Sequence, residues 1–531
     1  MKLEFILPKV RGRFQEDGLE VHKGDWIIKC FGYIININEL CQSNGTSIDE
    51  IIVNLIETNE NNLPLILKGA YLIYAENTKS SEILIYNDLL SKFSVFYTSV
   101  ERLCIVSDSF LSLVNRIKKS GGSLTPDSLA VKMMNKYECL FDDITYVKEI
   151  KYLTPYTYLK LNKNGLKTIQ IDIPLVNPTL HTDEILITLD NLFSKACEQI
   201  VQKNRLNHKK QVITISGGMD SRTTLLYGVK NGCSFNLSYC YSQGGSTDIE
   251  IAQKLSSRLG IPLLTYSMDN GWCLRDRENL IIKNDGMMCY SGTTGLSICL
   301  TNMDTTDWGL VHTGLGGGEI MGDITYPPSS NIINWKHFNE QLSCDKEETS
   351  RLRDIENKYT NFNEFSNLND LRRCLNSQKT AIECCDYASP FLDEEFFSFM
   401  LSVPYELKKN RELYFAWIKK FLPEHFNYKN TFRFGCKPNQ RVKYFLHRVC
   451  HGIINRLGFK TKHDMNPFMD WAKSNPILVL EQNSAFTRDI NLLKGKIDKQ
   501  IEDNLIVSYN NSSFRTRTHI LTSSYILTKI I

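Results

Sequence analysis

Two serines, two glycines and one carboxylate stand close together in the segment SGGMDS, residues 216–221. The preceding residues QVITI are apolar and β-branched as in a strand, and the following residues RTTLLYGVK fit a helix. In such a strand–turn–helix unit, consecutive backbone N–H groups and the positive end of the helix dipole face one spot, which favours an anion. Gly217 and Gly218 permit positive φ and let a ligand approach the main chain closely.

The side chains of this segment suit an anion that carries several phosphates. Ser216 and Ser221 add hydroxyl donors, and Asp220 is suited to hold a Mg²⁺ ion that neutralises a polyphosphate. The lysine of a GxxxxGK[ST] loop is absent, so the β- and γ-phosphates are not gripped in that manner. The alternative is a plain tight turn with a serine cap on the next helix, and the strand–turn–helix context favours the anion site.

The helices and strands expected from the sequence differ in type and order from one part of the chain to the next. Short runs of alternating apolar residues fill the first 110 residues and predict antiparallel sheets, followed by a helix near Ser128. A helical pattern over residues 182–204 then leads into alternating strands and helices, which is typical of a parallel sheet covered on both faces. The strands are expected at 211–215, 235–242 and 262–268, with a helix at 248–260. From about Phe338 onward the pattern is mostly helical.

Length and composition indicate a globular protein with more than one core. A chain of 531 residues exceeds one ordinary hydrophobic core, so two or more domains are expected. The chain is 42% hydrophobic and 23% charged with a net charge of +3, which points to neither a nucleic-acid nor a membrane partner.

Cysteine usage and the lack of targeting segments favour the cytoplasm. The sixteen cysteines are scattered, with no repeated metal-ligand spacing, so reduced thiols and no zinc site are expected. The N-terminus lacks the pattern of a secretory signal, and no uncharged apolar run approaches the roughly 18 residues that span a bilayer.

The segment SGGMDSR resembles the SGGxDS signature of ATP pyrophosphatases of the asparagine synthetase family. Three further segments are similar to motifs of that family and follow in its order: SQGGSTDIEIAQKLSSRLGIP (242–262), HTGLGGGEIMGD (312–323) and SPFLDEEFFSFMLSVPYELK (389–408). Weaker similarity to the family's glutamine amidotransferase domain lies in FGYIININEL, LKGAYLIYAEN, NDLLSKFSVFYTS and IVSDSFLSL. The resemblance therefore covers most of the chain, strongly after Gln211 and weakly before it.

The resemblance implies an α/β fold of two domains. Residues 1–180 would form an Ntn-hydrolase-like α/β/β/α sandwich, a degenerate glutamine amidotransferase-like domain. Residues 181–531 would form a parallel-sheet, adenine-nucleotide α-hydrolase-like (Rossmann-like) synthetase domain with a helical C-terminal part.

The resemblance also implies ATP and Mg²⁺ as ligands and gives roles to particular residues. The nucleotide would contact Ile215, Ser216, Gly217, Gly218, Asp220, Ser221, Thr313 and Gly314, with Asp220 on the metal. Lys437 stands at the position of the family's catalytic lysine, and Glu319 is expected to close the site and accept a proton. Arg222 replaces a serine of the family, and either a phosphate contact or a solvated first-turn residue fits it.

Several positions depart from the family pattern. The family's glutaminase begins with a cysteine after the initiator methionine, whereas the first thiols here are Cys30 and Cys41, which we interpret as small buried residues. We therefore expect that this domain keeps its fold and has lost glutamine hydrolysis. Leu315 and Gly318 stand where the family has a catalytic glutamate and a metal-binding aspartate. Asp393 is expected chiefly to cap the helix after it, although it borders the substrate pocket in the family.

The expected function is ATP-dependent amide-bond formation in a specialised biosynthetic pathway. A small-molecule or peptide carboxylate would be activated as an acyl-adenylate, with ATP cleaved to AMP and pyrophosphate. An amine whose source is something other than glutamine hydrolysed by this chain would then attack it. The alternatives are a non-catalytic nucleotide-binding scaffold of the same fold and a glutamine-dependent asparagine synthase. No nucleic-acid or membrane partner is expected, and a homodimer or a complex with pathway enzymes stays open.

Overall fold

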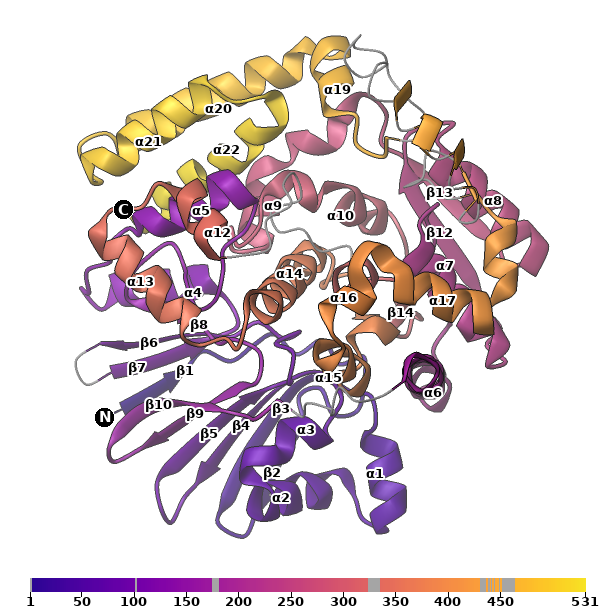
Figure 1. Ribbon diagram of the computed structural model, residues 1–531. Coiled ribbons are helices and arrows are strands. Elements are labelled where there is room, and N and C mark those ends of the chain that lie inside the picture. The colour runs from indigo at the N-terminus through magenta and orange to yellow at the C-terminus, as the bar shows by residue number, and fades with distance from the viewer. Residues whose placement is uncertain are drawn as a thin grey trace.

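The computed structural model describes residues 2–100, 103–173, 181–322, 335–429 and 464–531, with short pieces at 436–437, 440, 442–443, 445–447 and 449–450. Figure 1 shows two N-terminal sheets, in indigo and purple, below a larger helical region, with the yellow C-terminal helices arching across the top. Within the described ranges, no helix combines the length and apolar character that crossing a membrane requires.

The N-terminal region is built on two sheets. The six-stranded sheet has the order β10-β9-β5-β4-β3-β2 and is antiparallel throughout, and the four-stranded sheet has the order β1-β7-β6-β8. In the smaller sheet, β1 pairs with β7 in parallel and the other pairs are antiparallel. The strands are β1 (Lys2–Phe5), β2 (Glu20–Lys23), β3 (Trp26–Ile34), β4 (Gly69–Asn77), β5 (Glu82–Asn87), β6 (Phe96–Val100), β7 (Leu103–Ser107), β8 (Ile150–Tyr152), β9 (Thr157–Asn162) and β10 (Gly165–Gln170).

Alternating side chains make this region a four-layer sandwich. On β3, Ile28 and Cys30 face one hydrophobic cluster while Phe31 faces another, as the two-residue period of a strand requires. The cluster with Phe31 lies between the sheets, and the one with Cys30 lies under helices. The outer helices are α1 (Ile37–Asn44), α2 (Ile48–Thr58) and α3 (Leu63–Ile66) with η1 (Glu60–Asn62) on one side, and α4 (Phe110–Lys119) and α5 (Ser128–Tyr137) on the other. The predicted sandwich and the helix near Ser128 are confirmed.

The second region begins with helix α6 and a parallel sheet, as predicted. Its five strands have the order β13-β12-β11-β14-β15, and every pair is parallel. The strands are β11 (Val212–Thr214), β12 (Leu237–Ser242), β13 (Leu263–Ser267), β14 (Val311–His312) and β15 (Tyr387–Ala388). Helices of this part are α6 (Thr182–Leu206), α7 (Met219–Lys230), α8 (Thr247–Leu259), α9 (Arg277–Lys283), α10 (Thr294–Thr301) and α11 (Gly317–Ile320), with η2 (Asp269–Arg275) and η3 (Tyr290–Gly292). The two-residue strands β14 and β15 are too short to leave a periodic signal, and the sequence did not predict them.

The described part of the chain from about Phe338 onward is mostly helical, as predicted. It contains α12 (Trp335–Leu342), α13 (Lys346–Glu356), α14 (Phe362–Lys379), α15 (Glu394–Ser402), α16 (Tyr405–Lys408), α17 (Glu412–Phe421), α19 (Phe468–Ser474), α20 (Pro476–Leu493), α21 (Lys499–Asn510) and α22 (Phe514–Ile530), with η4 (Pro390–Leu392), η5 (Lys409–Arg411) and η6 (Pro423–Asn427). The last helices pack back onto the N-terminal region, because one hydrophobic cluster includes both Met134 of α5 and Ile526 of α22. That core crosses the predicted boundary at residue 180, and the division into 1–180 and 181–531 stays a prediction.

Candidate functional site

The parallel strands reverse their order at β11, and the region outside the carboxyl ends of β11 and β14 is hereafter called the crevice. β11 connects through α7 to β12 on one side, while β14 lies on its other side, so the direction of winding reverses there. Ligands of open parallel sheets bind at such a reversal, outside the carboxyl ends of the strands. The loop after β11 (215–218) and the loop after β14 (313–316) both leave the sheet at this edge.

Side-chain oxygens already hold the N–H groups of the loop after β11. Ser216 N donates to Ser221 Oγ (3.1 Å), Gly217 N to Asp248 Oδ1 (2.7 Å) and Gly218 N to Ser216 Oγ (3.2 Å). The expectation that these consecutive groups are aimed at one anion is therefore wrong for this structure. Neither glycine has positive φ, and Gly218 is extended, with φ −72° and ψ 171°.

The start of α7 remains suited to an anion. Its N-cap is Gly218, and no side chain caps the first turn. The N-terminal amide groups and the positive end of the helix dipole therefore face the crevice without a protein oxygen as cap. The Ser216 and Ser221 hydroxyls lie 3.0 Å apart beside it. The anion site predicted from the sequence thus shifts from the loop to the helix start and its two hydroxyls.

One oxygen of Asp220 has no hydrogen-bond donor among the residues that the structure describes. Its Oδ1 is buried without a hydrogen-bond partner, and Arg411 Nη1 lies 3.8 Å from it. Burial raises the pKa of Asp220, Arg411 lowers it, and the charge of Glu319 raises it further. A buried carboxylate with an unsatisfied oxygen is stabilised by a bound cation, so Asp220 fits the proposed Mg²⁺.

The glycine-rich loop after β14 packs directly on the start of α7. A Cβ atom on Gly314 would lie 2.2 Å from Ser221 N, and one on Gly317 would lie 2.7 Å from the Asp220 side chain. Thr313 fixes the loop to the sheet, since its N–H donates to Ala388 O at 3.0 Å. Any residue with a side chain at 314 or 317 would push the two loops apart, so the glycines set the width of the crevice.

Glu319 is tied to α14 rather than left free in the crevice. Its Oε1 accepts from Arg373 Nη2 (3.1 Å) and from Cys374 Sγ (2.9 Å). Leu315 is partly buried and Gly318 is buried. Neither residue type carries a carboxylate, so the acidic groups that the resemblance would place at these positions are missing.

Arg222 is fully buried. Its guanidinium donates to three backbone carbonyls, those of Gly217 (3.3 Å), His425 (3.3 Å) and Lys429 (2.5 Å). Burial lowers the pKa of Arg222 to about 10. The alternative of a solvated first-turn residue is wrong, and the observed contacts give Arg222 a positioning role beneath the loop.

Ile215 and Lys437 are the remaining predicted residues, and fewer of their contacts are described. Ile215 is buried in the core behind the loop, and its N–H donates to Tyr239 O at 2.9 Å. Lys437 is partly buried, and its N–H donates to Gln440 Oε1 at 3.1 Å. The flanking residues 430–435 and 438–439, which include Arg433 and Pro438, lie outside the described part. The assignment of Lys437 to the site stays a prediction.

A cavity of about 130 Å³ lies on the other side of the loop after β14. Its wall includes Thr313 and Leu315 from that loop and Tyr33 from the N-terminal sandwich, so it sits between the two regions. The basic side chains on its wall are each ion-paired: Arg11 with Asp386 (2.7 Å), Lys92 with Glu394 (2.6 Å) and Lys379 with Asp285 (2.6 Å). With its cations paired, the cavity suits a small neutral molecule or an amine better than an anion.

Asp393 also borders this cavity and caps α15, as predicted. Its Oδ1 accepts from Glu395 N and Phe396 N, both at 3.1 Å, and its Oδ2 accepts from Lys68 Nζ at 2.9 Å. The cap therefore also links the N-terminal sandwich to the second region.

The first thiols of the chain are not placed as nucleophiles. Cys30 is 1% exposed on β3, and burial raises its pKa far above the ordinary range. Cys41 is partly buried on α1, and burial raises its pKa as well. Thiols with raised pKa values contain little thiolate near neutral pH, so both lack the usual activation.

Sequence reasoning missed Asp248 and Arg411 as contributors to the site. Asp248 opens α8, and its carboxylate receives Gly217 N; the Ser/Asp pair at 246–248 was the available signal. Arg411 precedes α17 and adopts φ +59°, which places a cation beside Asp220. No local pattern marked Arg411, because its contact joins distant parts of the chain.

Comparisons with known proteins leave the chain without an assigned family. No family model and no curated protein matches it. Two of the solved structures that match the chain at a low level are examples. One is described as the allosteric regulatory enzyme of purine biosynthesis, with 11% identity over 48% of this chain and a TM-score of 0.22. The other is NMN synthetase from Francisella tularensis, with 15% identity over 36% of this chain and a TM-score of 0.20. The matches cover 64% of the first structure, slightly under two thirds, and 93% of the second.

Proposed function

We propose that this chain is an ATP-dependent amide-bond synthetase that activates a carboxylate as an acyl-adenylate. The observation that carries the proposal is the uncapped start of α7 at the strand reversal, with the Ser216 and Ser221 hydroxyls beside it and an unsatisfied oxygen on Asp220 in its first turn. The four segments that resemble asparagine synthetase-type ATP pyrophosphatases support the choice of ATP among nucleotides. The triphosphate would lie over residues 216–221, with Thr313 and Gly314 along its other side.

The proposed reaction has two steps. A carboxylate oxygen of the substrate attacks the α-phosphorus of ATP, and the bond to the β-phosphate oxygen breaks to release pyrophosphate. An amine nitrogen then attacks the acyl carbon, the carbon–oxygen bond to AMP breaks, and the amine loses one proton. The products are an amide, AMP and pyrophosphate.

Each proposed residue has a defined task in those steps. The α7 N-terminus, Ser216 and Ser221 bind phosphate oxygens, while Asp248 and Arg222 hold the loop in shape from behind. Mg²⁺, held by Asp220, would supply charge neutralisation of the triphosphate. Lys437 would stabilise charge on the α-phosphate. Glu319 would take the amine proton on Oε2, because its Oε1 already accepts from Arg373 and Cys374.

The amine in this proposal does not come from glutamine hydrolysed by this chain. The buried Cys30 and the partly buried Cys41 offer no activated thiol. The cavity between the regions adjoins Thr313 and Leu315, and its size fits a small amine. We therefore place the amine on the cavity side of the glycine loop and the nucleotide on the α7 side, in an enzyme of a dedicated biosynthetic pathway.

A second candidate is a scaffold that binds nucleotide without turning it over. Two observations favour it: the loop N–H groups are satisfied within the protein, and Leu315 and Gly318 stand where the resembling family has acidic residues. A glutamine-dependent synthase is a third candidate, and it predicts glutaminase activity that thiol alkylation abolishes.

Pyrophosphate release from ATP, measured with a panel of carboxylates and ammonia or amines, tests the proposal. We expect release that requires both Mg²⁺ and a carboxylate, and exchange of labelled pyrophosphate into ATP without the amine. Asp220→Asn and Lys437→Met should each lower the rate about 10²–10³-fold. The matched controls are Asp307→Asn and Lys443→Met, which alter exposed side chains with no part in the proposed reaction and should keep the rate.

The outcomes separate the candidates. ATP binding by equilibrium dialysis without release for any carboxylate supports the scaffold. Glutaminase activity lost after thiol alkylation supports the third candidate. Absence of ATP binding at millimolar Mg²⁺ contradicts both the enzyme and the nucleotide-binding scaffold.

A further inference from the structure

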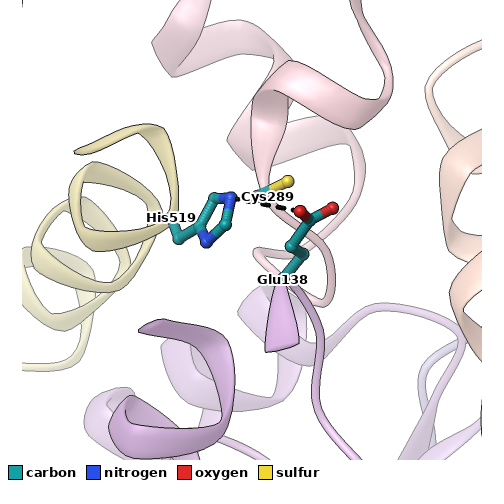
Figure 2. Close-up of side chains that lie close together, drawn as sticks. All are labelled: Glu138, Cys289 and His519. Atoms are coloured by element: carbon teal, nitrogen blue, oxygen red, sulfur yellow. Dashed lines mark ion pairs between the residues drawn. The ribbon is translucent and has the colours of Figure 1, made fainter. Parts of the chain in front are cut away.

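Three potential metal ligands from distant parts of the chain meet away from the crevice. They are Glu138 at the end of α5, Cys289 just before η3 and His519 on α22. One ligand atom from each, a carboxylate oxygen, Sγ and a ring nitrogen, lies within 4.8 Å of the others. Figure 2 shows the three side chains pointing toward one another from three separate elements.

The main chain fixes two of these residues against each other. Cys289 N donates to Glu138 O at 2.8 Å, and Cys139 forms an antiparallel bridge with Met288. Glu138 is the C-cap of α5 with φ +68°, so its side chain leaves the helix end rather than continuing along it. The main chains at Glu138 and Cys289 are therefore held side by side, which limits the separation of the carboxylate and the thiol.

One ring nitrogen of His519, Nε2, makes no hydrogen bond to the described residues. Nδ1 lies 3.4 Å from Asn135 O, and because a carbonyl only accepts, Nδ1 carries the hydrogen in that contact. In the neutral ring, Nε2 then presents a lone pair. Nε2 is buried, has no hydrogen-bond partner within the described ranges, and faces Glu138 Oε1 at 3.5 Å. Two electron-rich atoms face each other, which a cation between them would relieve.

We propose that Glu138, Cys289 and His519 bind a zinc ion. Carboxylate oxygen, thiolate sulfur and imidazole nitrogen together form a ligand set that suits Zn²⁺ better than Mg²⁺ or Ca²⁺. A histidine whose other nitrogen is held by a backbone carbonyl is the usual arrangement of a metal ligand. Binding would release the Cys289 proton to solvent, and the ion would balance the charges of the thiolate and the carboxylate. A water molecule would complete the fourth position.

The surroundings of the cluster are consistent with a structural role. Cys289 is 1% and His519 is 5% exposed, so the ion would be largely shielded from solvent. Arg515 Nη2 donates to Glu138 Oε1 at 2.8 Å, which matches the hydrogen bonds that ligating carboxylates commonly receive. The ion would join α5 of the N-terminal sandwich, the segment after α9 and the C-terminal helix α22. This inference is independent of the proposed synthetase activity.

The absence of a zinc pattern in the sequence does not count against this site. Sequence patterns detect ligands that are close together along the chain. Here the three ligands stand at positions 138, 289 and 519, so only the packing of α22 against α5 brings them together.

Metal binding by the purified full-length chain tests the proposal. After chelator treatment, the protein is loaded with Zn²⁺ or with Co²⁺, and its metal content is measured by atomic emission. We expect about one zinc ion per chain. In the cobalt form, we expect a near-ultraviolet charge-transfer band that reports a thiolate ligand. Zinc should also raise the unfolding temperature, because it binds the folded chain.

Variants identify the ligands. Cys289→Ser should remove the cobalt band, and both Cys289→Ser and His519→Gln should weaken zinc binding at least about tenfold and remove the thermal shift. The matched control is Cys299→Ser on α10, a thiol that is also 1% exposed and should leave all three readouts unchanged.

Two results would overturn the proposal. One is wild-type protein that takes up no stoichiometric zinc and shows no thiolate band, in which case the cluster is an ordinary buried ion pair. The other is Cys289→Ser protein that keeps the band and the affinity. The wild-type spectrum decides the matter even if both variants fail to fold.

Discussion

Burial acts on ionisable groups in both regions of this molecule, but with different consequences. In the N-terminal sandwich, Cys30 lies on β3 among apolar side chains under the outer helices, and burial suppresses its thiolate. In the parallel-sheet region, burial also raises the pKa of Asp220, yet the cation of Arg411 lies 3.8 Å from its Oδ1 and lowers that pKa. Desolvation among apolar side chains alone keeps an ionisable group in its neutral form. Desolvation beside an opposite charge leaves the group able to bind a charged ligand.

The buried ion pair that joins the two regions is expected to have the largest effect on stability. Lys203 of α6 and Glu16 of the sandwich form an ion pair at 2.5 Å with side chains 0% and 1% exposed. Lys203→Met should leave Glu16 buried without its cation and lower the free energy of unfolding by about 3–5 kcal/mol. Urea unfolding followed by circular dichroism measures this loss.

Two controls sharpen that experiment. Adding Glu16→Leu to Lys203→Met should recover much of the stability, since both charges are then gone. Lys254→Met breaks the exposed pair with Glu250 and should cost roughly 0.5 kcal/mol or less. Equal effects of Lys203→Met and Lys254→Met would contradict the importance of the buried pair.

The close packing of Gly314 against α7 controls the width of the crevice. A methyl group at position 314 would lie 2.2 Å from Ser221 N, so Gly314→Ala should force the loop away from α7. We expect about 1–3 kcal/mol of destabilisation and a loss of ATP affinity, measured by thermal unfolding and equilibrium dialysis. Gly121→Ala is the control, because Gly121 has φ +79° in open space and strains the backbone without touching the site. If both variants bind ATP like the wild type, the glycine loop does not shape the nucleotide site.

Asp370 tests whether burial raises a carboxyl pKa in the region that contains the site. Burial raises the pKa of Asp370 to about 7, against the lowering effect of Arg373 and with a further raise from Glu319. The folded chain therefore holds a proton that the unfolded chain releases above about pH 4, and stability is lost as pH rises toward the folded pKa. Between about pH 5 and about pH 8, the wild type should lose about 2 kcal/mol more than Asp370→Asn. Parallel pH profiles of the two proteins would show that Asp370 ionises normally.

Replacing Cys41, a thiol of the sandwich, is expected to have the smallest effect on activity and stability. Cys41→Ala should leave both pyrophosphate release and stability unchanged within about 0.5 kcal/mol, because Cys41 is partly exposed on α1 and has no part in the proposed chemistry. The rate of pyrophosphate release with saturating amine measures this. A large loss of activity in Cys41→Ala would show that the sandwich takes part in the chemistry after all.

Local patterns predicted the elements of this protein well and its contacts poorly. The strand, turn and helix around residues 212–230 were predictable because apolar periodicity and glycine placement are properties of neighbouring residues. The same reasoning predicted the cap at Asp393 and the buried Cys30. It misjudged Arg222 and the loop N–H groups, whose partners lie elsewhere in the chain.

Patterns along the chain were enough to identify the helices and strands and the chemical types available at each turn. The tertiary structure alone decided which of those groups became donors, which became buried supports and which stayed unsatisfied. Gly217 meets Asp248 across 31 residues, and Arg222 meets Lys429 across 207. Such contacts depend on how whole helices and sheets pack, because burial and pairing are set by neighbours in space and not along the chain.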